Sequence, residues 1–527
     1  MLGKIAIIDF LLRNKVHDIF YLPGIHTLPL SECITAQNMN VFMPRHESNM
    51  TFMADGFARA SGKTGILIVT PGPGLGNVVT GCMEAYGDNI PLLVIHIDTG
   101  REEIGKGILH ELVEPENIFR YITKKTFSVH GREDFVPELE KAFRATMTGR
   151  KGPVLISIPY TLLEKEVSFQ CADEANSTSL GQCHDLSDLE NILINKKKPV
   201  IIGGKSLMFE QACPLLDEIC RGSSIPFFTT TSGKGIVDEE NPWCFGNIIQ
   251  KGVVKEIVSS ADVTIAIGTR LRDVDAKRRG VKIRELVHFD IDDTWMNKNY
   301  PASFKASGEI LPFLQYLRNI NHGKTFDWPL IELKERQLQE RKDLNGKFLG
   351  FQLMHLLKEV IPNETVTVWD LNLMAYWAEY YYPVHHQHTF IMPRGISPIF
   401  YALPAAIGAK LARPDRPCLA VCGDGGALPA IGELSTIQKY KIPIVILIFN
   451  NNSFGILENY MNSTYSIKGA MDLHNPDFVK IAASFGVKAK RAKTLRQLKN
   501  IFLHNVTWDE PFLLEFSGPV FPPPWRA

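Results

Sequence analysis

The sequence has no long hydrophobic run and no excess of either charge. No stretch reaches about 18 consecutive apolar residues, the length that predicts a transmembrane helix, so we expect no membrane span. Lysine plus arginine and aspartate plus glutamate each number 57, which gives a formal net charge of zero. This balance argues against a nucleic-acid partner, because such partners select for basic surfaces. Any anionic ligand must therefore be bound by a local group of residues.

Cysteine is also scarce. The chain has nine cysteines in 527 residues, and no two of them form a Cys-x-x-Cys pair. This pattern predicts reduced thiols and a cytoplasmic protein.

Asp9 and Arg13 interrupt the apolar run in residues 1–15, and no small-residue cleavage site follows it. We therefore expect an amphipathic first helix there and not a signal peptide.

Length and periodicity predict three domains of the α/β class. A chain of 527 residues exceeds a single ordinary core, and 45% hydrophobic residues is typical of a globular protein. Strand-like and helix-like segments alternate within 1–165, 186–320 and 346–527, which predicts three doubly wound parallel-sheet domains. The polar residues 166–187 are expected to be a linker, and the charged residues 318–345 a helical connector on the surface.

Residues 423–454 give the strongest indication of chemistry. Gly-Asp-Gly at 423–425 and three asparagines at 450–452 each follow an apolar run. Glycines permit a tight turn, and the N–H groups that open the next helix can face an anion. Asp424 and Asn451 offer the oxygen ligands that Mg²⁺ prefers. The pattern predicts a site for a metal-bound diphosphate. An ordinary strand–helix turn would explain Gly-Asp-Gly alone but not the second polar run.

This stretch resembles the thiamine-diphosphate motif of the superfamily that contains acetolactate synthase, pyruvate decarboxylase and benzoylformate decarboxylase. The resemblance covers essentially the whole chain, in the order pyrimidine-binding, central and diphosphate-binding domain. It is closest in pattern to acetolactate-synthase-like large subunits. It implies that Mg²⁺ is held by Asp424, Asn451 and the backbone carbonyl of Ser453. It further implies that the cofactor contacts Gly423, Gly425, Gly426 and Phe454.

A second motif lies near the N-terminus. Arg45-His46-Glu47 precedes a helix of apolar and small residues, where the family carries the glutamate that hydrogen-bonds N1′ of the cofactor pyrimidine. The resemblance therefore implies a catalytic, cofactor-binding role for Glu47. Alone, this glutamate would be explained more simply by its interaction with the helix macrodipole. The Gly/Pro-rich residues 70–77 resemble the adjoining family loop, which implies cofactor contacts from Gly74 and Asn77.

The segment 394–404 resembles the family loop that supports the bent cofactor. Ile399 falls at the position of the bulky aliphatic wedge, and Ile396 is expected to contact the cofactor from the same loop. The segment has fewer glycines than most relatives have there. A place for Ile399 in the hydrophobic core is the alternative, since most isoleucines are buried.

Several positions concern the substrate pocket and depart from familiar patterns. His110 occupies a position where acetolactate synthases carry glutamine and pyruvate decarboxylases histidine, and it could transfer a proton. Ile25 and His26 are bulkier than the Gly-Ala of acetolactate synthases, and Thr70 stands where benzoylformate decarboxylase has histidine. Three further positions follow the asparagine run. They are Leu457, Glu458 and Tyr460.

The resemblance implies a thiamine-diphosphate- and Mg²⁺-dependent enzyme that decarboxylates a 2-oxo acid and can ligate the product to a second carbonyl. Acetolactate synthases carry arginine and tryptophan where this chain has Glu458 and Tyr460, which argues against acetolactate formation from two pyruvates. Family geometry implies a homodimer at minimum, and often a homotetramer.

Other interpretations remain open from the sequence. A lyase or decarboxylase acting on a 2-hydroxyacyl or oxalyl thioester of CoA would need a cationic contact for phosphate, for which residues 277–279 are the candidate. A non-catalytic relative is the other alternative. Gly203-Gly204 is an incomplete nucleotide fingerprint. The histidine-rich loop 385–388 lacks the spacing of a tetrahedral metal site and is expected at the surface.

Overall fold

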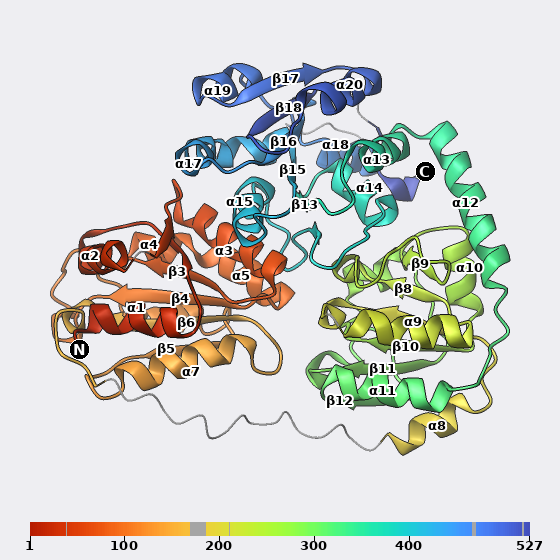
Figure 1. Cartoon of the computed structure of the whole chain (residues 1–527), viewed down its shortest axis with the longest axis horizontal. Helices are drawn as coiled ribbons and strands as arrows, with labels where there is room; N and C mark the ends of the chain where they lie inside the picture. The colour runs from red at the N-terminus through yellow and green to blue at the C-terminus, as the bar shows by residue number, and fades with distance from the viewer. Residues whose placement is uncertain (38, 169–185, 210, 466–470, 519–520, 527) are drawn as a thin grey trace.

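The computed structural model describes residues 1–37, 39–168, 186–209, 211–465, 471–518 and 521–526. Most of the predicted linker, 169–185, lies outside these residues. The described chain forms three α/β units, drawn in red to orange, yellow to green, and blue in Figure 1. Each contains a six-stranded, wholly parallel sheet with helices on its faces, so the predicted fold class is confirmed.

The first and third sheets have the same strand order, counted within each unit. The first runs β2-β1-β3-β4-β6-β5, and the third β14-β13-β15-β16-β18-β17. The strands of the first are β1 Asp18–Tyr21, β2 Asn40–Phe42, β3 Gly65–Val69, β4 Leu92–Asp98, β5 Lys125–Ser128 and β6 Pro153–Pro159. Those of the third are β13 Val366–Trp369, β14 Phe390–Ile391, β15 Cys418–Gly423, β16 Val445–Phe449, β17 Lys488–Ala492 and β18 Phe512–Phe516. No internal repeat of residues indicates this shared topology.

The central sheet has a different order, β12-β11-β10-β7-β8-β9. Counted from its own first strand, this is the 3-2-1-4-5-6 order of dinucleotide-binding folds, with the order reversing between β7 and β10. Its strands are β7 Pro199–Gly203, β8 Phe227–Thr229, β9 Cys244–Asn247, β10 Val263–Ile267, β11 Leu286–Asp290 and β12 Phe304–Ser307. The unit has its own apolar core.

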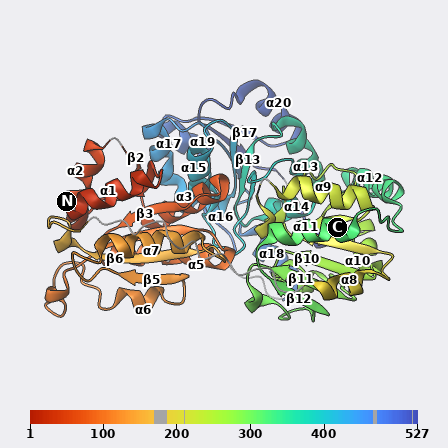
Figure 2. The same ribbon diagram turned by 60° about the horizontal axis from the view of Figure 1, so that its bottom comes forward.

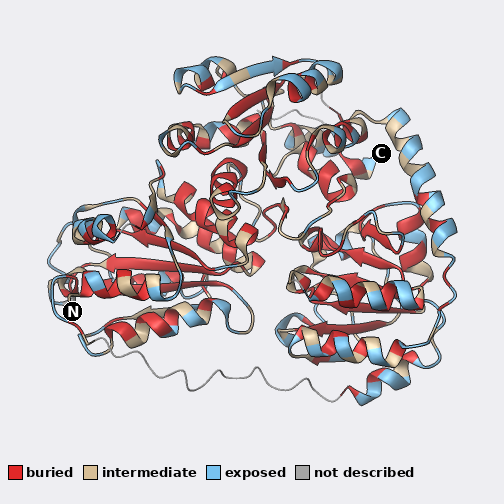
Figure 3. Cartoon of the chain, viewed as in Figure 1, coloured by how far each residue is buried: buried red, intermediate tan, exposed pale blue. Residues whose placement is uncertain are grey.

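The charged connector is largely helical. Helix α11 (Ile310–Asn321) closes the central unit, and α12 (Leu330–Lys347) runs along the outside of the molecule to the third unit (Figures 1 and 2). Figure 3 shows that α12 has mostly exposed and half-buried residues, whereas the central strands of all three sheets are buried. This is the expected contrast between parallel strands covered on both faces and a surface helix.

The first and third units share one apolar core. They meet where α3 (Glu47–Ser61) crosses α15 (Ala402–Ala412) (Figure 1). The crossing is a backbone-to-backbone contact: a Cβ on Gly56 would lie 2.0 Å from the carbonyl oxygen of Ala405, and one on Gly408 would lie 1.8 Å from that of Met53. Only glycine fits at both positions, so these two residues determine how closely the two units approach.

The histidine-rich loop 385–388 lies only partly at the predicted surface. His386 is exposed, whereas His385 and His388 are half-buried: Nδ1 of His385 lies 3.0 Å from Asp238, and Nδ1 of His388 lies 2.7 Å from the carbonyl oxygen of Arg59. Both connect neighbouring units, which single-sequence spacing does not indicate. Near the C-terminus, Pro524–Arg526 form a short 3₁₀ helix. Within the described residues, no helix is both long and apolar enough to cross a membrane.

The α3–α15 crossing yields a stability prediction. We expect Gly56→Ala to lower the free energy of unfolding by about 3 kcal/mol or more, because the added methyl group must displace the α15 backbone. Gly222→Ala is the matched control in the helix α9 (Ala212–Ser223), where a Cβ meets nothing within 4 Å. It should leave stability unchanged or raise it by about 0.5–1 kcal/mol. Urea denaturation monitored by fluorescence measures both, and equal effects would contradict the close-packing account.

Candidate active site

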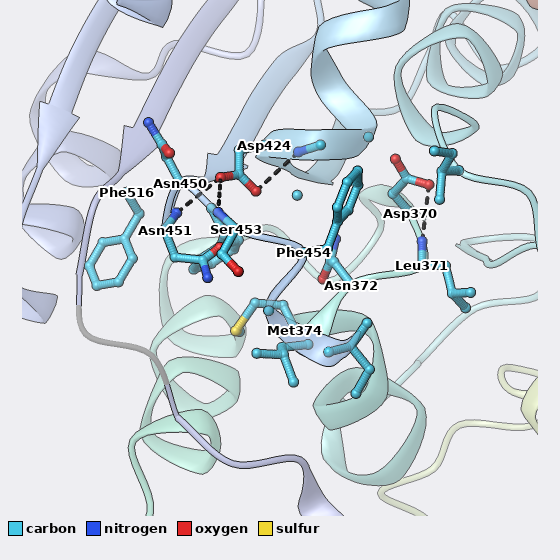
Figure 4. A pocket seen from close by; sticks show the side chains of 18 of the residues that line it. Asp370, Leu371, Asn372, Met374, Asp424, Asn450, Asn451, Ser453, Phe454 and Phe516 are labelled. Carbon is cyan, nitrogen blue, oxygen red and sulfur yellow. Dashed lines mark hydrogen bonds between the residues drawn. The ribbon is translucent and has the colours of Figure 1, made fainter. Parts of the chain in front are cut away.

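A pocket opens in the third unit at the carboxyl ends of four adjacent strands (Figure 4). Asp370 follows β13, Asp424 follows β15, Asn451 follows β16, and Gly518 lies beyond β18. The carboxyl edge of a parallel α/β sheet is the usual place for a ligand. Each of these strands is buried and ends where polar side chains begin, which is why the chemistry gathers at this edge.

The Asp424 carboxylate accepts several hydrogen bonds in the pocket. It is 3% exposed, and its Oδ2 accepts hydrogen bonds from the backbone N–H groups of Asn451 and Ser453, both at 3.3 Å (Figure 4). Asn475 donates to the same oxygen at 2.8 Å, and the Gly425 N–H donates to Oδ1 at 3.0 Å. Burial raises the pKa of Asp424, and these donors act against that shift. The contacts fix the carboxylate beside the asparagine run, as the sequence predicts.

The two glycines after Asp424 keep the pocket open. A Cβ on Gly425 would lie 2.5 Å from the ring of Phe454, and one on Gly426 would lie 2.1 Å from Oδ2 of Asp370. Larger residues would therefore collide with the pocket wall at both positions. Bare backbone at the start of a helix is the arrangement that accommodates phosphate oxygens.

Two helices begin at the pocket. The first is α14 (Leu373–Tyr381), whose N-cap Asn372 accepts a hydrogen bond from the N–H of Ala375 at 2.9 Å. The second is α18 (Gly455–Thr464), which starts directly after Ser453 and Phe454. Both helix N-termini carry a partial positive charge, which favours an anion in the pocket. The sequence prediction did not include α14, although Asp370 and Asn372, like Asp424, are polar residues that follow an apolar strand.

Asp370 is a buried carboxyl group in the pocket wall. It is 1% exposed, and its Oδ2 has no hydrogen-bond partner in the described part of the chain. Burial raises its pKa to about 7, although the backbone N–H groups of Leu371, Tyr401 and Phe400 act against the shift. A carboxyl group in this environment carries a proton at mildly acidic pH.

The donor set fits a metal-bound diphosphate. Asp424, the amide of Asn451 and the carbonyl of Ser453 are hard oxygen donors from neighbouring positions at one sheet edge. The buried amide nitrogen of Asn451 has no partner among the described residues. Rotation of this amide by a half-turn exchanges its nitrogen and oxygen, so the group can present an oxygen to a cation. Ile399 also lines this pocket, and its side chain is 43% exposed, so its predicted core alternative is wrong.

The N-terminal candidates form a second cluster. Oε2 of Glu47 accepts a hydrogen bond from Nδ2 of Asn77 at 2.9 Å, and Asn77 also accepts one from Ser48 at 2.7 Å. A Cβ on Gly74 would lie 2.4 Å from Oγ1 of Thr70 and 3.9 Å from Oε1 of Glu47. The loop 70–77 therefore closes directly over Glu47, and the two predicted motifs meet.

His26 and His110 lie at the same edge of the first sheet. Their ring centres are 5.7 Å apart, and the Nδ1 atoms of both are buried without a partner in the described residues. Burial and the neighbouring His110 lower the pKa of His26, while Glu103 raises it. His110 has a φ of +66°, an uncommon conformation for a non-glycine residue that fixes the direction of its side chain. Ile25, beside His26, is 62% exposed.

The two clusters do not meet within one chain. No described residue of the first unit lines the pocket that contains Asp424. The cause is the orientation of α3: Asn49 faces the third unit, where it donates to Glu433 at 2.8 Å. Glu47 precedes it by two residues, about 200° around the helix, and is therefore directed away from that unit. Each chain carries two halves of a site that face different directions.

The predicted substrate residues after the asparagine run lie on α18. Ser453 donates to Glu458 at 2.8 Å, and the rings of Tyr460 and Trp525 are stacked with centres 6.2 Å apart. Leu457 and Tyr460 remain 48% and 45% exposed. Asn475, which contacts Asp424, was missed because its loop has no periodic pattern.

A separate cavity is lined by residues of all three units, close to the point where the central strand order reverses. Its lining combines apolar side chains with cationic ones, among them Arg150, Lys151 and Lys205. This is the position where doubly wound sheets bind ligands. The incomplete Gly203-Gly204 motif leads directly into it.

These features are matched by three models of one protein family. The N-terminal thiamine pyrophosphate-binding domain matches residues 1–118, the central domain 186–317, and the C-terminal thiamine pyrophosphate-binding domain 372–516. The chain belongs to the thiamine pyrophosphate enzymes. The family resemblance drawn from the two motifs is thereby confirmed.

Individual relatives span nearly the whole chain. A probable acetolactate synthase large subunit of Methanocaldococcus jannaschii is 29% identical over 100% of this chain and 94% of its own length. The corresponding protein of Methanococcus aeolicus is 28% identical over 98% and 92%. A probable 2-ketoarginine decarboxylase of Pseudomonas aeruginosa is 29% identical over 94% and 90%. The chain is thus similar to enzymes named for two different reactions.

The buried carboxyl group of Asp370 predicts a pH dependence. Its pKa is raised from 3.8 to about 7, so between these values the folded protein binds a proton that the unfolded chain has lost. The free energy of unfolding therefore falls as pH rises through this window. We expect Asp370→Asn in the cofactor-free protein to gain stability relative to wild type by about 2 kcal/mol between about pH 5 and about pH 7.

Urea denaturation at the two pH values measures this difference. Asp477→Asn is the control: Asp477 caps α19 (Phe478–Ser484), and its backbone hydrogen bonds hold its pKa below the ordinary value. That group stays ionised across the window, so its substitution should have the same effect at both pH values. A pH-independent effect of Asp370→Asn would contradict the assignment.

Proposed function

We propose that the protein is a thiamine-diphosphate- and Mg²⁺-dependent enzyme that decarboxylates a 2-oxo acid and either releases the product or ligates it to a second carbonyl. The observation that carries this proposal is the group around Asp424, where a buried carboxylate, the asparagine run and two helix N-termini face one pocket. Membership of the thiamine pyrophosphate enzymes supports the cofactor. The oxygen donors that line the pocket support Mg²⁺ as the metal.

In this proposal Asp424, Asn451 and the Ser453 carbonyl would hold Mg²⁺, and the bare backbone at 425 and 426 would leave room for the diphosphate. When bound, thiamine diphosphate would supply a nucleophilic carbon and an acceptor for the electron pair released in decarboxylation. Ile399 lines the pocket and Ile396 lies in the same loop, so both would pack against the cofactor. The apolar wall beside them excludes water from the reacting carbon.

Glu47 is the proposed group for proton exchange with the cofactor. Its Oε2 accepts a hydrogen bond from Asn77, and its Oε1 lies on the side of Gly74. A carboxyl group held in this way can exchange a proton with a ring nitrogen at hydrogen-bond distance. Asn77 thus has a positioning role, and Gly74 keeps the space in front of Glu47 clear.

His26 and His110 are the candidates for proton transfer to and from the substrate. Their buried Nδ1 atoms have no partner among the residues that the structure describes, and a neutral imidazole can accept or donate a proton near neutral pH. Thr70 and Ile25 would line the same side of the pocket. From the opposite side, α18 would contribute Leu457, Glu458 and Tyr460.

The relatives support both reaction branches. Acetolactate synthases ligate their product, whereas the Pseudomonas relative is named as a decarboxylase. Glu458 offers an acidic group where a second 2-oxo acid would need a cation, and its carboxylate is occupied by Ser453. This favours decarboxylation, or ligation to an uncharged acceptor, over the joining of two 2-oxo acids.

An acyl-CoA lyase is a weaker candidate. Of the basic run 277–279, Arg279 is half-buried and lies 3.4 Å from Glu379 and 4.6 Å from the centre of the Trp525 ring. Arg278 is paired with Asp273 at 3.0 Å. The run is therefore largely engaged by protein groups. A non-catalytic role is disfavoured because both half-sites keep their full set of functional groups.

We also propose that two copies of the chain complete each site, in a homodimer or homotetramer. The outward direction of Glu47 and the absence of first-unit residues from the described lining of the Asp424 pocket support this. So do the exposed apolar side chains beside both half-sites, among them Ile25, Leu109, Ile396 and Leu457. A second copy would cover such surfaces. A cytoplasmic location also remains part of this proposal.

Release of CO₂ from a panel of 2-oxo acids tests the function. We expect release from at least one acid, dependent on thiamine diphosphate and Mg²⁺. Glu47→Gln should keep cofactor binding by isothermal titration but lower turnover by about a hundredfold or more, because a general acid–base group is lost. No release from any acid, with turnover of an acyl-CoA instead, would select the lyase. Near-normal turnover of Glu47→Gln would refute its assigned role.

A further inference from the structure

We propose that Glu84 is a positioning residue for the cofactor. It holds the loop 394–401, which carries Ile396 and Ile399, in a strained conformation at the wall of the Asp424 pocket. The proposal rests on the proposed cofactor site and adds to it a residue of the first unit that touches neither the pocket nor the reacting atoms. Glu84 belongs to α5 (Val79–Asp88) and is wholly buried.

Three consecutive backbone N–H groups donate to the Glu84 carboxylate. Gly395 donates to Oε1 at 2.9 Å, and Ile396 and Ser397 donate to Oε2 at 2.8 and 3.0 Å. Gly395 lies directly against the α5 backbone, since a Cβ there would lie 2.2 Å from the carbonyl oxygen of Glu84. The Glu84 carboxylate thus accepts hydrogen bonds from three loop N–H groups, as a bound anion would. The close contact between Gly395 and the α5 backbone prevents the loop from moving toward the helix.

Buried charges extend the same contact on both sides. Arg59 pairs with Glu84 at 3.1 Å and with Asp88 at 2.7 Å. Asp88 accepts from the backbone N–H of Arg394 at 3.2 Å, and Arg272 of the central unit donates to the Arg394 carbonyl at 2.6 Å. The backbone entering the loop is therefore held by groups of the other two units. Moving one of these groups would leave a buried charge without its partner, which is energetically costly. The arrangement is therefore rigid.

The loop needs this support because it contains two unfavourable residues. Ser397 has a φ of +60° and Phe400 a φ of +56°, a region that side-chain-bearing residues rarely adopt. Such a conformation is unfavourable for a residue with a side chain and persists only where surrounding contacts impose it. Glu84 supplies these contacts at Ser397. At Phe400 the backbone N–H interacts with Asp370.

In this proposal, the conformation of the loop determines the position of the pocket wall. Ile399 lies between the two strained residues and lines the pocket, and Ile396 donates its own N–H to Glu84. Without the carboxylate, Ser397 would relax toward negative φ and the wall would move. The loop would then have to be re-ordered at each cofactor binding event, at the expense of affinity.

Cofactor affinity of Glu84→Gln tests the proposal. Glutamine keeps the shape but exchanges one acceptor oxygen for a donor that faces the backbone N–H groups. We expect its dissociation constant for thiamine diphosphate, measured by isothermal titration with saturating Mg²⁺, to rise by about tenfold or more. The matched control is Glu239→Gln, which removes a buried carboxylate paired with Lys234 at 2.7 Å, away from the loop. It should lower the melting temperature without changing this constant.

Two outcomes would overturn the proposal. One is an unchanged dissociation constant in Glu84→Gln, and the other is an equal loss of affinity in both variants, which would mark a general effect of stability. Failure of wild type to bind the cofactor would instead refute the proposed function.

Hydrogen exchange of the cofactor-free wild-type protein keeps the proposal falsifiable if Glu84→Gln does not fold. The amides of Gly395, Ile396 and Ser397 should be protected before cofactor is added. Exchange at the rate of an open loop would contradict their bonds to Glu84.

Discussion

The arrangement of the whole site depends on the contact between α3 and α15. Because Gly56 and Gly408 lack side chains, the two helices touch through their backbones, and the first and third units are locked in one orientation. That orientation directs Asn49 into the third unit and Glu47 away from it. A close-packed crossing of this kind has little freedom to rotate. The separation of the two half-sites within one chain is therefore a consequence of helix packing.

The chemistry is divided between the two units according to the same rule. In each unit, polar groups collect at the carboxyl edge of a parallel sheet: Asp424 and Asn451 in one, and Thr70 and His26 in the other. In our proposal the first unit supplies proton-handling groups, and the third supplies metal and phosphate ligands. In our account the buried charge network around Glu84 then links them, because a side chain of the first unit holds the loop of the third in place.

The fold class and the centre of the site were predictable from sequence because both depend on local pattern. Apolar runs followed by Gly-Asp-Gly or by asparagines define sheet edges, and the position of Asp424 beside Asn451 follows from parallel topology. Asn475 was not predictable, since its contact with Asp424 spans 51 positions and leaves no periodic trace. Glu84 has the residue type of a surface position, and Ser397 gives no local indication of a left-handed backbone. Such features follow from tertiary packing and not from neighbouring residues.

The central claim is that each site uses Glu47 of one chain and Asp424 of another. Co-expression of Glu47→Gln and Asp424→Ala chains with different tags, followed by tandem purification, gives hybrids in which one of every two sites has both residues intact. The account predicts that each parent variant is nearly inactive in CO₂ release and that the hybrid regains about half of the wild-type turnover per dimer. A hybrid no more active than its parents would contradict it, because the two residues would then act within the same chain.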